Sequence, residues 1–172
     1  MRQRIAALAA VCACAGAPLV AVSPAARAAG GACPTQTFTY RHGIVSFNEH
    51  GDVTRVQVEI AENTLSQEYG LMCRASLAPN AGMLFSFSQS SQDPFWMKNT
   101  LIPLSIAFMD ARWRIVTLLD MPVAPDPENG PFVYYTSKAP YRYALEVNQG
   151  FFSQHGIDTG ADVVFQAIGA VR

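Results

Sequence analysis

The chain has 172 residues, and its 12 basic and 13 acidic side chains leave a formal net charge of −1 at pH 7. Charged residues make up 15% of the sequence and form no lysine- or arginine-rich run, which argues against a nucleic acid or an anionic membrane surface as partner. The length suits one domain with a single core.

Residues 1–28 are typical of a signal peptide. Two arginines precede an apolar run over residues 5–22, and Ala26-Arg27-Ala28 places small residues where a signal peptidase cleaves. We therefore predict cleavage near Ala28 and a mature protein that is periplasmic or secreted. A retained membrane anchor is the alternative, but Gly16 and Pro18 interrupt a run that is short for a spanning helix, which needs roughly 20 apolar residues.

The rest of the chain is predicted to form one domain. Residues 29–52 are expected to hold an N-terminal arm and a first strand, and residues 53–172 a single globular domain. Three of the 12 basic residues (Arg2, Arg4, Arg27) lie in the predicted leader, which leaves 9 basic against 13 acidic side chains and a charge near −4. Such a charge favours solubility and indicates no specific partner.

Two cysteines remain after the predicted leader, Cys33 and Cys73. In an exported protein they could form a disulfide, because thiols outside the cytoplasm tend to be oxidised. The bridge would tie the N-terminal arm to the segment around Cys73. The alternative is two free thiols, with Cys73 buried as a small apolar residue.

The first elements of the predicted domain are a strand and a short helix. Residues 53–61 alternate, with Val56, Val58 and Ile60 on one face, which is the period of a half-buried strand. Thr64 and Gln67 have the spacing of a capping box, and Gly70 is a natural stop, so a helix is predicted over 65–69.

A second group of strands follows. Residues 83–87 read as a short buried strand, and 88–94 as a polar loop. Residues 104–109 and 112–119 read as two strands joined by a turn at Asp110-Ala111, and strands this close in sequence form an antiparallel hairpin.

The last third begins with a proline-rich stretch, residues 122–131, which is predicted to be a surface loop and is long enough to be a lid. A strand over 141–147, a short helix ending at Gly156 and a final strand over 161–168 complete the pattern. The fold class is therefore mainly β (α+β): a compact antiparallel β-sheet or barrel-like single domain with two short helices.

Several segments, in this order, resemble the family catalogued as domain of unknown function 192. The matching segments are Gly70-Leu71-Met72 with Arg74, Gly82-Met83-Leu84-Phe85 with Phe87, Phe95-Trp96-Met97-Lys98-Asn99-Thr100 with Pro103-Leu104, Phe108 with Asp110, Leu145-Glu146-Val147, and Gly150-Phe151-Phe152 with His155-Gly156-Ile157. The resemblance covers about residues 53–168.

The resemblance implies a compact, mainly β domain that is often exported, and it implies no activity. The chain departs from the family pattern at Cys73, which stands where an aromatic residue is usual and so supports a bridge to Cys33. It also lacks the cysteine that members often carry before the Leu145-Glu146-Val147 strand, so any thiol chemistry proposed for that position does not transfer.

The candidate site is the polar cluster of Lys98 and Asn99, which lies between the Phe95-Trp96 pair and an apolar strand. Lys98 offers a cation, Asn99 a paired donor and acceptor, and Trp96 a flat wall, which suits a small polar or anionic ligand. Arg74 and Glu146 are the expected companions. A purely structural role is the alternative, in which Lys98 neutralises Glu146 or another carboxylate and Arg74 caps a helix.

Two further functions are weighed against ligand binding. An enzyme would use Lys98 as electrostatic stabiliser and Glu146 as acid or base, but His42, His50 and His155 lack metal-ligand spacing and no cofactor is indicated. An envelope protein-interaction module would use the apolar stretch 132–135 as its contact surface.

Overall fold

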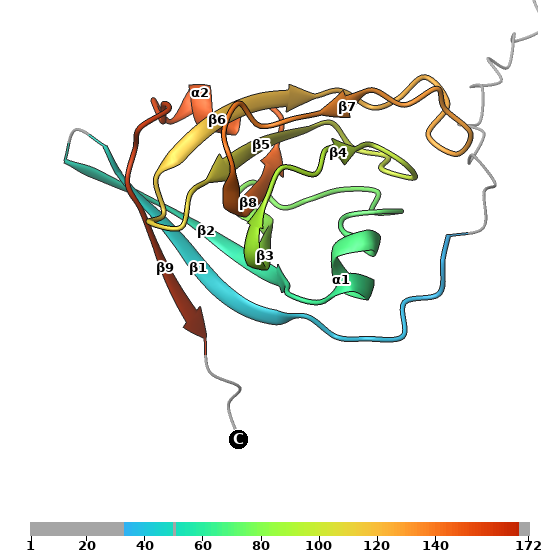
Figure 1. Ribbon diagram of the computed structural model, residues 1–172, viewed down its shortest axis with the longest axis horizontal. Helices are drawn as coiled ribbons and strands as arrows, with labels where there is room; N and C mark the ends of the chain where they lie inside the picture. The colour runs from blue at the N-terminus through green and yellow to red at the C-terminus, as the bar shows by residue number, and fades with distance from the viewer. Residues whose placement is uncertain (1–32, 50, 169–172) are drawn as a thin grey trace, which may run out of the picture. The chain divides into compact units, whose positions relative to one another are not determined.

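The protein is mainly β with two short helices, as the sequence predicts (Figure 1). The structure is a computed structural model and describes residues 33–49 and 51–168. The predicted signal peptide, its cleavage near Ala28 and the side chain of His50 lie outside the described residues.

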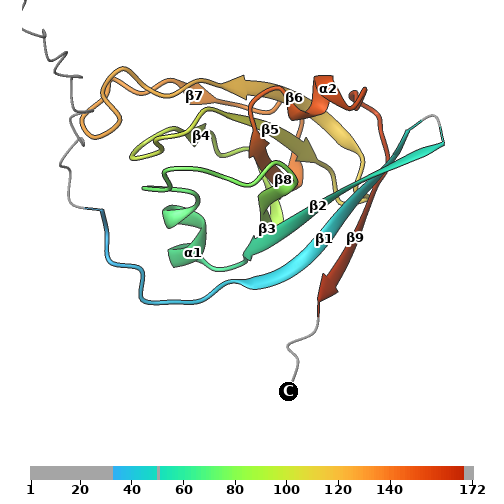
Figure 2. The same cartoon turned by 180° about the vertical axis from the view of Figure 1, so that it is seen from behind.

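Strands dominate the described part of the chain. They are β1 (Arg41–Glu49), β2 (Asp52–Ala61), β3 (Ala81–Ser91), β4 (Phe95–Trp96), β5 (Leu104–Met109), β6 (Ile115–Met121), β7 (Tyr134–Tyr135), β8 (Tyr141–Asn148) and β9 (Val163–Ile168). The helices are α1 (Thr64–Tyr69) and α2 (Phe151–Gln154). In both views α1 lies at the same end of the large sheet as β4 and β7, and α2 at the other end (Figure 1, Figure 2).

The large sheet has seven strands in the order β6-β5-β8-β3-β2-β1-β9, and β4 pairs with β7 in a separate two-stranded sheet. The prediction of an antiparallel sheet needs one correction, because β2 and β3 run parallel. The chain segment that carries α1 returns the chain to the starting end of β2, which a parallel pair requires. The sheet is not a closed barrel, although Arg114 and Asp162, which directly precede the edge strands β6 and β9, form an isolated bridge.

The central strands β3, β5 and β8 are covered on both faces, which explains why all six residues of β5 are buried. One face packs with α2 and β9, and its buried residues include Val58, Leu84, Leu145, Phe152 and Val163. The opposite face packs with the segment from α1 to β5, and its buried residues include Leu71, Met83, Phe85, Met97, Ile106 and Ala144. Because side chains alternate along a strand, Glu146 shares the second face with Ala144.

Most predicted elements are confirmed with shifted ends. The capping box of α1 lies one residue earlier than expected: Asn63 accepts from the Ser66 N–H at 3.1 Å, and Ser66 accepts in return from Asn63. Strand β3 continues to Ser91 through a segment predicted as loop. Strand β6 begins at Ile115 rather than at residue 112, because Trp113 has a left-handed φ of 63° and extends the turn.

The proline-rich stretch 122–131 lies outside helices and strands, as predicted. Asp126 organises it by accepting hydrogen bonds from the backbone N–H groups of Glu128 and Asn129, and the bonds from Asn129 lower the pKa of this carboxyl group. The loop is anchored at Pro127, whose carbonyl oxygen accepts from the Asn99 N–H at 2.6 Å. It therefore supports the backbone of the predicted site.

Candidate functional site

An open groove of about 480 Å³ runs between the N-terminal arm, α1 and the segment after β4. We call it the arm groove. Its lining residues come from the arm (Pro34, Thr35, Thr37, Phe38), from α1 (Leu65, Glu68, Tyr69), and from Met72, Trp96, Lys98 and Asn99. Three residues of the predicted site, Trp96, Lys98 and Asn99, thus lie together in one groove, and none of the lining residues comes from the proline-rich loop.

The arm wall of the groove is held in place at two points. A disulfide joins Cys33 to Cys73, with 6.0 Å between their Cα atoms, as the pairing hypothesis predicts. Phe38 packs edge-to-face against Tyr40 and Tyr69, with ring centroids 5.2 and 5.8 Å apart. A segment without periodic sequence is fixed here by a covalent bond and by aromatic contacts.

Lys98 extends over the indole of Trp96, with 5.4 Å between its Nζ atom and the ring centroid. A cation at this distance is attracted by the negative face of the ring. Among the described residues no carboxylate forms an ion pair with Lys98, whereas Arg41, Arg74 and Arg114 each have an acidic partner. The structural alternative, in which Lys98 neutralises Glu146 or another carboxylate, therefore has no such ion pair among the described residues.

Asn99 adopts a left-handed backbone conformation, with φ of 51°. Its N–H donates to Pro127, and its carbonyl oxygen accepts from the Cys73 N–H at 2.8 Å. The carboxamide has only a weak contact, from Nδ2 to the sulfur of Met72 at 4.0 Å. The backbone is thus fully used, while the side chain keeps most of its hydrogen-bonding capacity.

Arg74 does not line the groove. It forms an ion pair with Glu59 of β2 and lies 6.0 Å from the centroid of the Tyr40 ring. Burial raises the pKa of Tyr40 to about 12; Arg74 opposes the rise, while Glu59, Tyr69 and Glu146 add to it. The structure therefore separates Arg74 from Lys98 and assigns it to a structural polar cluster with Glu59 and Tyr40.

Glu146 does not line the arm groove but a smaller cavity of about 40 Å³, which shares Trp96 and Lys98 with the groove and is also lined by Thr100. The residue is 5% exposed, and loss of water contact raises the pKa of its carboxyl group to about 8. In the part of the chain that the structure describes, no side chain or backbone group forms a hydrogen bond or ion pair with that carboxyl. The sequence singled out Glu146 as a candidate site residue because it is an acid within an otherwise apolar strand.

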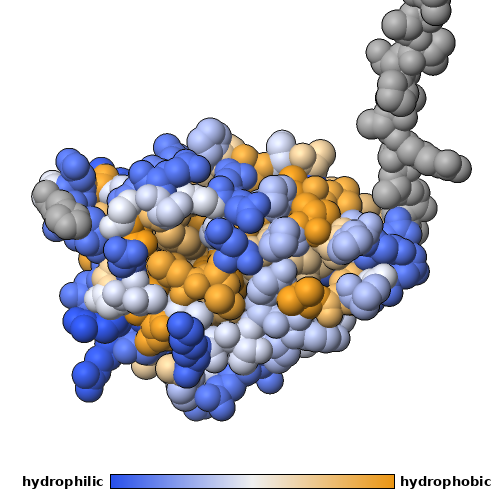
Figure 3. All heavy atoms as spheres, turned by 90° about the horizontal axis from the view of Figure 1, so that it is seen from above, coloured by the Kyte–Doolittle hydropathy of each residue, from blue (hydrophilic) through white to orange (hydrophobic). Residues whose placement is uncertain are grey.

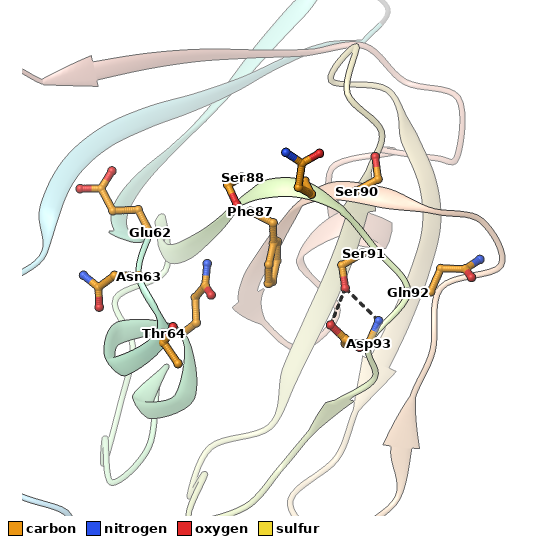
Figure 4. Close-up of a pocket in the computed structure, with 11 residues that line it drawn as sticks. Glu62, Asn63, Thr64, Phe87, Ser88, Ser90, Ser91, Gln92 and Asp93 are labelled. Carbon is orange, nitrogen blue, oxygen red and sulfur yellow. Dashed lines mark hydrogen bonds between the residues drawn. The ribbon is translucent and has the colours of Figure 1, made fainter.

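Sequence reasoning missed a second hollow, of about 460 Å³, between the start of α1 and the end of β3 (Figure 4). Its lining is polar: Glu62, Asn63, Thr64, Gln67, Phe87 and residues 88–93. Ser91 donates to the Asp93 carboxylate at 2.8 Å and accepts from the Asp93 N–H at 2.9 Å, so these two groups satisfy each other (Figure 4). The hollow has no charged group comparable to the unpaired Lys98 ammonium of the arm groove among the contacts described, and it is therefore the weaker candidate for a binding site.

Metal ligands do not gather in the described residues, where no group of three or more histidine, cysteine or acidic side chains could hold an ion. His155 donates from Nδ1 to the Phe151 carbonyl oxygen at 2.8 Å, which accounts for it structurally. Within the same residues, no helix has the length and apolar character that crossing a membrane requires.

The family whose model matches the chain carries no stated activity. The family model for DUF192, described as an uncharacterized ACR, matches residues 45–165. A Sinorhizobium meliloti protein described as a candidate transcription regulator is 28% identical, with a TM-score of 0.66 over 76% of this chain and 98% of that one. A Novosphingobium aromaticivorans protein of unknown function is 28% identical, with a TM-score of 0.63 over 70% and 83%. No curated protein matches the chain.

Proposed function

We propose that this protein, which belongs to the family DUF192, is an exported protein that binds a small polar or anionic ligand in the arm groove. Export rests on the signal-peptide pattern of residues 1–28 and the Cys33–Cys73 bridge, since disulfides persist in oxidising compartments. Binding rests on the groove.

The observation that carries the proposal is the position of Lys98. Its ammonium lies over Trp96, at the wall of the groove, and has no ion-pair partner among the described residues. By contrast, the half-buried Arg74 meets the carboxylate of Glu59. A cation kept free beside an aromatic wall offers an anion both charge and an apolar surface.

Asn99 adds directional recognition. Its backbone forms hydrogen bonds with Pro127 and Cys73. These bonds hold the residue at the groove and leave the carboxamide able to form hydrogen bonds with a ligand. A ligand that hydrogen-bonds to it would not have to order the segment first, and such preorganisation favours binding. The left-handed conformation is one that asparagine tolerates better than most residues.

The groove also has the size and surface of a ligand site. A volume of about 480 Å³ falls within the usual range of roughly 300–1,000 Å³. Its walls combine apolar side chains with a few polar ones, and the apolar members are Pro34, Phe38, Leu65, Tyr69, Met72 and Trp96. A ligand with a carbon skeleton and one acidic or polar end would use both kinds of wall.

The test uses the two tryptophans as reporter and control. Acetate, succinate and inorganic phosphate are added at constant ionic strength to protein labelled with ¹⁵N, and the two indole N–H signals are followed by NMR. The proposal expects saturable movement of the Trp96 signal with at least one anion, while Trp113, stacked between Tyr143 and Phe165, stays fixed. Identical small drifts of both signals with every anion would overturn it.

A protein-interaction module is the second candidate, because exposed apolar residues lie beside the groove. Val133 and Tyr134 are 64% and 59% exposed, and Tyr134 stacks on Trp96 with 6.2 Å between ring centroids. Figure 3 shows apolar residues gathered on the face that carries β6 and β7, with hydrophilic residues around them. Loss of partner capture in Tyr134→Ala, with an unchanged anion response, would favour this candidate.

A further inference from the structure

The register of the large sheet places Glu146 in a row with one other acid. Glu59 of β2 pairs with Met83 of β3, which pairs with Glu146 of β8. All three side chains point to the face that α1 covers, since Met83 belongs to the core on that face. Glu59 is neutralised by Arg74, but Glu146 has no such partner in the described chain.

The cavity beside Glu146 is small and is lined by aromatic rings and by residues of α1. Its lining includes Phe85, Phe95 and Trp96, together with Gln67, Glu68 and Tyr69. A volume of about 40 Å³ exceeds the roughly 10–15 Å³ that one water needs, so two or three non-hydrogen atoms fit. A larger group would have to displace side chains.

The charges that face the cavity favour a cation. Two acids, Glu146 and Glu68, line the cavity together with one base, Lys98, and aromatic faces attract cations. The nearby basic groups do not compensate Glu146: Arg74 is paired with Glu59, and the Lys98 ammonium lies over Trp96. Tyr69 also lines the cavity, and the nearby Tyr40 donates its hydroxyl to the Gly70 carbonyl oxygen at 3.1 Å.

A buried carboxyl without a partner is costly to ionise, and that cost disappears when an opposite charge arrives. An anion in the same cavity would meet Glu68 and Glu146 as well as Lys98, and it would leave the Glu146 carboxyl without an opposite charge. We propose that the cavity above Glu146 is a subsite for a small cationic group, an ammonium ion or a primary alkylammonium end, whose charge Glu146 neutralises.

The test measures the titration of Glu146 itself. Protein labelled with ¹³C at glutamate carboxyl groups is titrated by NMR from pH 5 to 10 in methylammonium chloride or, at equal ionic strength, in tetramethylammonium chloride. Methylammonium fits the cavity and tetramethylammonium does not. Glu146 is recognised as the glutamate with the highest pKa and by the loss of its signal in Glu146→Gln.

The expected result is a pKa of Glu146 lower by at least one unit in methylammonium than in tetramethylammonium, because bound cation favours the ionised carboxyl. Equivalently, methylammonium binds at least tenfold more tightly at pH 9 than at pH 6. Equal titration curves in the two salts would overturn the proposal, since they would mean that only ionic screening acts. Should Glu146→Gln fail to fold, the comparison of the two salts on the unaltered protein still decides.

This inference goes beyond anion binding in the arm groove, and the two can fail separately. The effect of methylammonium on Glu146 should persist in Lys98→Met, which removes the cation proposed for the groove. The response of Trp96 to anions should persist in Glu146→Gln. Loss of one response with retention of the other therefore identifies which site is absent.

Discussion

The Nζ atom of Lys98 lies 5.4 Å from the centroid of the Trp96 ring, and the two side chains form one wall of the arm groove. Trp96 is 40% exposed, so the pair stands at the edge of the core rather than within it. At an exposed site a contact of this kind contributes about 0.5–1 kcal/mol. That is too little to explain on its own why Lys98 forms no ion pair with a described carboxylate.

The buried carboxyl of Glu146 predicts an unusual dependence of stability on pH. Its pKa is about 8 in the folded protein against an ordinary 4.5, so the folded state keeps a proton that the unfolded state loses. The resulting stabilisation is complete below pH 4.5 and falls by about 1.4 kcal/mol per pH unit up to pH 8.

We therefore expect the free energy of unfolding of the native protein to fall relative to that of Glu146→Gln between pH 4.5 and 8. Urea unfolding at pH 4.5, 6 and 8 measures it. Glu62→Gln removes an exposed glutamate that does not line the cavity of Glu146, and it should follow the native curve. Parallel curves for the native protein and Glu146→Gln would show that Glu146 titrates normally.

The disulfide between Cys33 and Cys73 predicts a large loss of stability on its removal. The bridged residues are 40 positions apart, and the chain-entropy model gives about 4 kcal/mol for a loop of that length. Replacing both cysteines by serine should lower the urea midpoint accordingly. A reducing agent should lower the midpoint of the native protein and leave that of the double variant unchanged; an insensitive native protein would contradict the bridge.

Asn99 allows its backbone role and its side-chain role to be separated. At φ of 51° glycine is unstrained, while alanine costs roughly 1–2 kcal/mol. Asn99→Ala should thus unfold more easily than Asn99→Gly. Both variants lose the carboxamide, so both should bind the responding anion about fivefold more weakly, the equivalent of one hydrogen bond of about 1 kcal/mol. Full binding by Asn99→Gly would assign the side chain a structural role only.

Local sequence pattern predicted the elements that depend on neighbouring residues. The alternation of Val56, Val58 and Ile60 gave strand β2, and two apolar runs with a short turn gave the β5–β6 hairpin. The parallel pairing of β2 with β3 was not predictable in this way, because it depends on where the α1 segment returns the chain. The pairing of β4 with β7 joins two-residue strands almost 40 positions apart and has no periodic signal.

The candidate site was predicted only in part, because sequence pattern reports on residues that are neighbours in the chain. Trp96, Lys98 and Asn99 are neighbours in sequence, so their proximity in the groove follows from the chain itself. The arm residues that complete the groove are brought there by the disulfide and the Phe38 contacts, which no local pattern encodes. Arg74 was expected beside Lys98, but the ion pair with Glu59 draws it to the sheet.

The most direct test of anion binding in the arm groove compares two lysines. Lys98→Met and Lys138→Met each remove one positive charge, and Lys138 is exposed and does not line the groove. The dissociation constant of the anion that moves the Trp96 indole signal is measured for both variants by the same NMR titration. We expect Lys98→Met to weaken binding by about tenfold, the equivalent of one charged hydrogen bond, and Lys138→Met to leave it unchanged. Equal dissociation constants for the two variants would contradict the account.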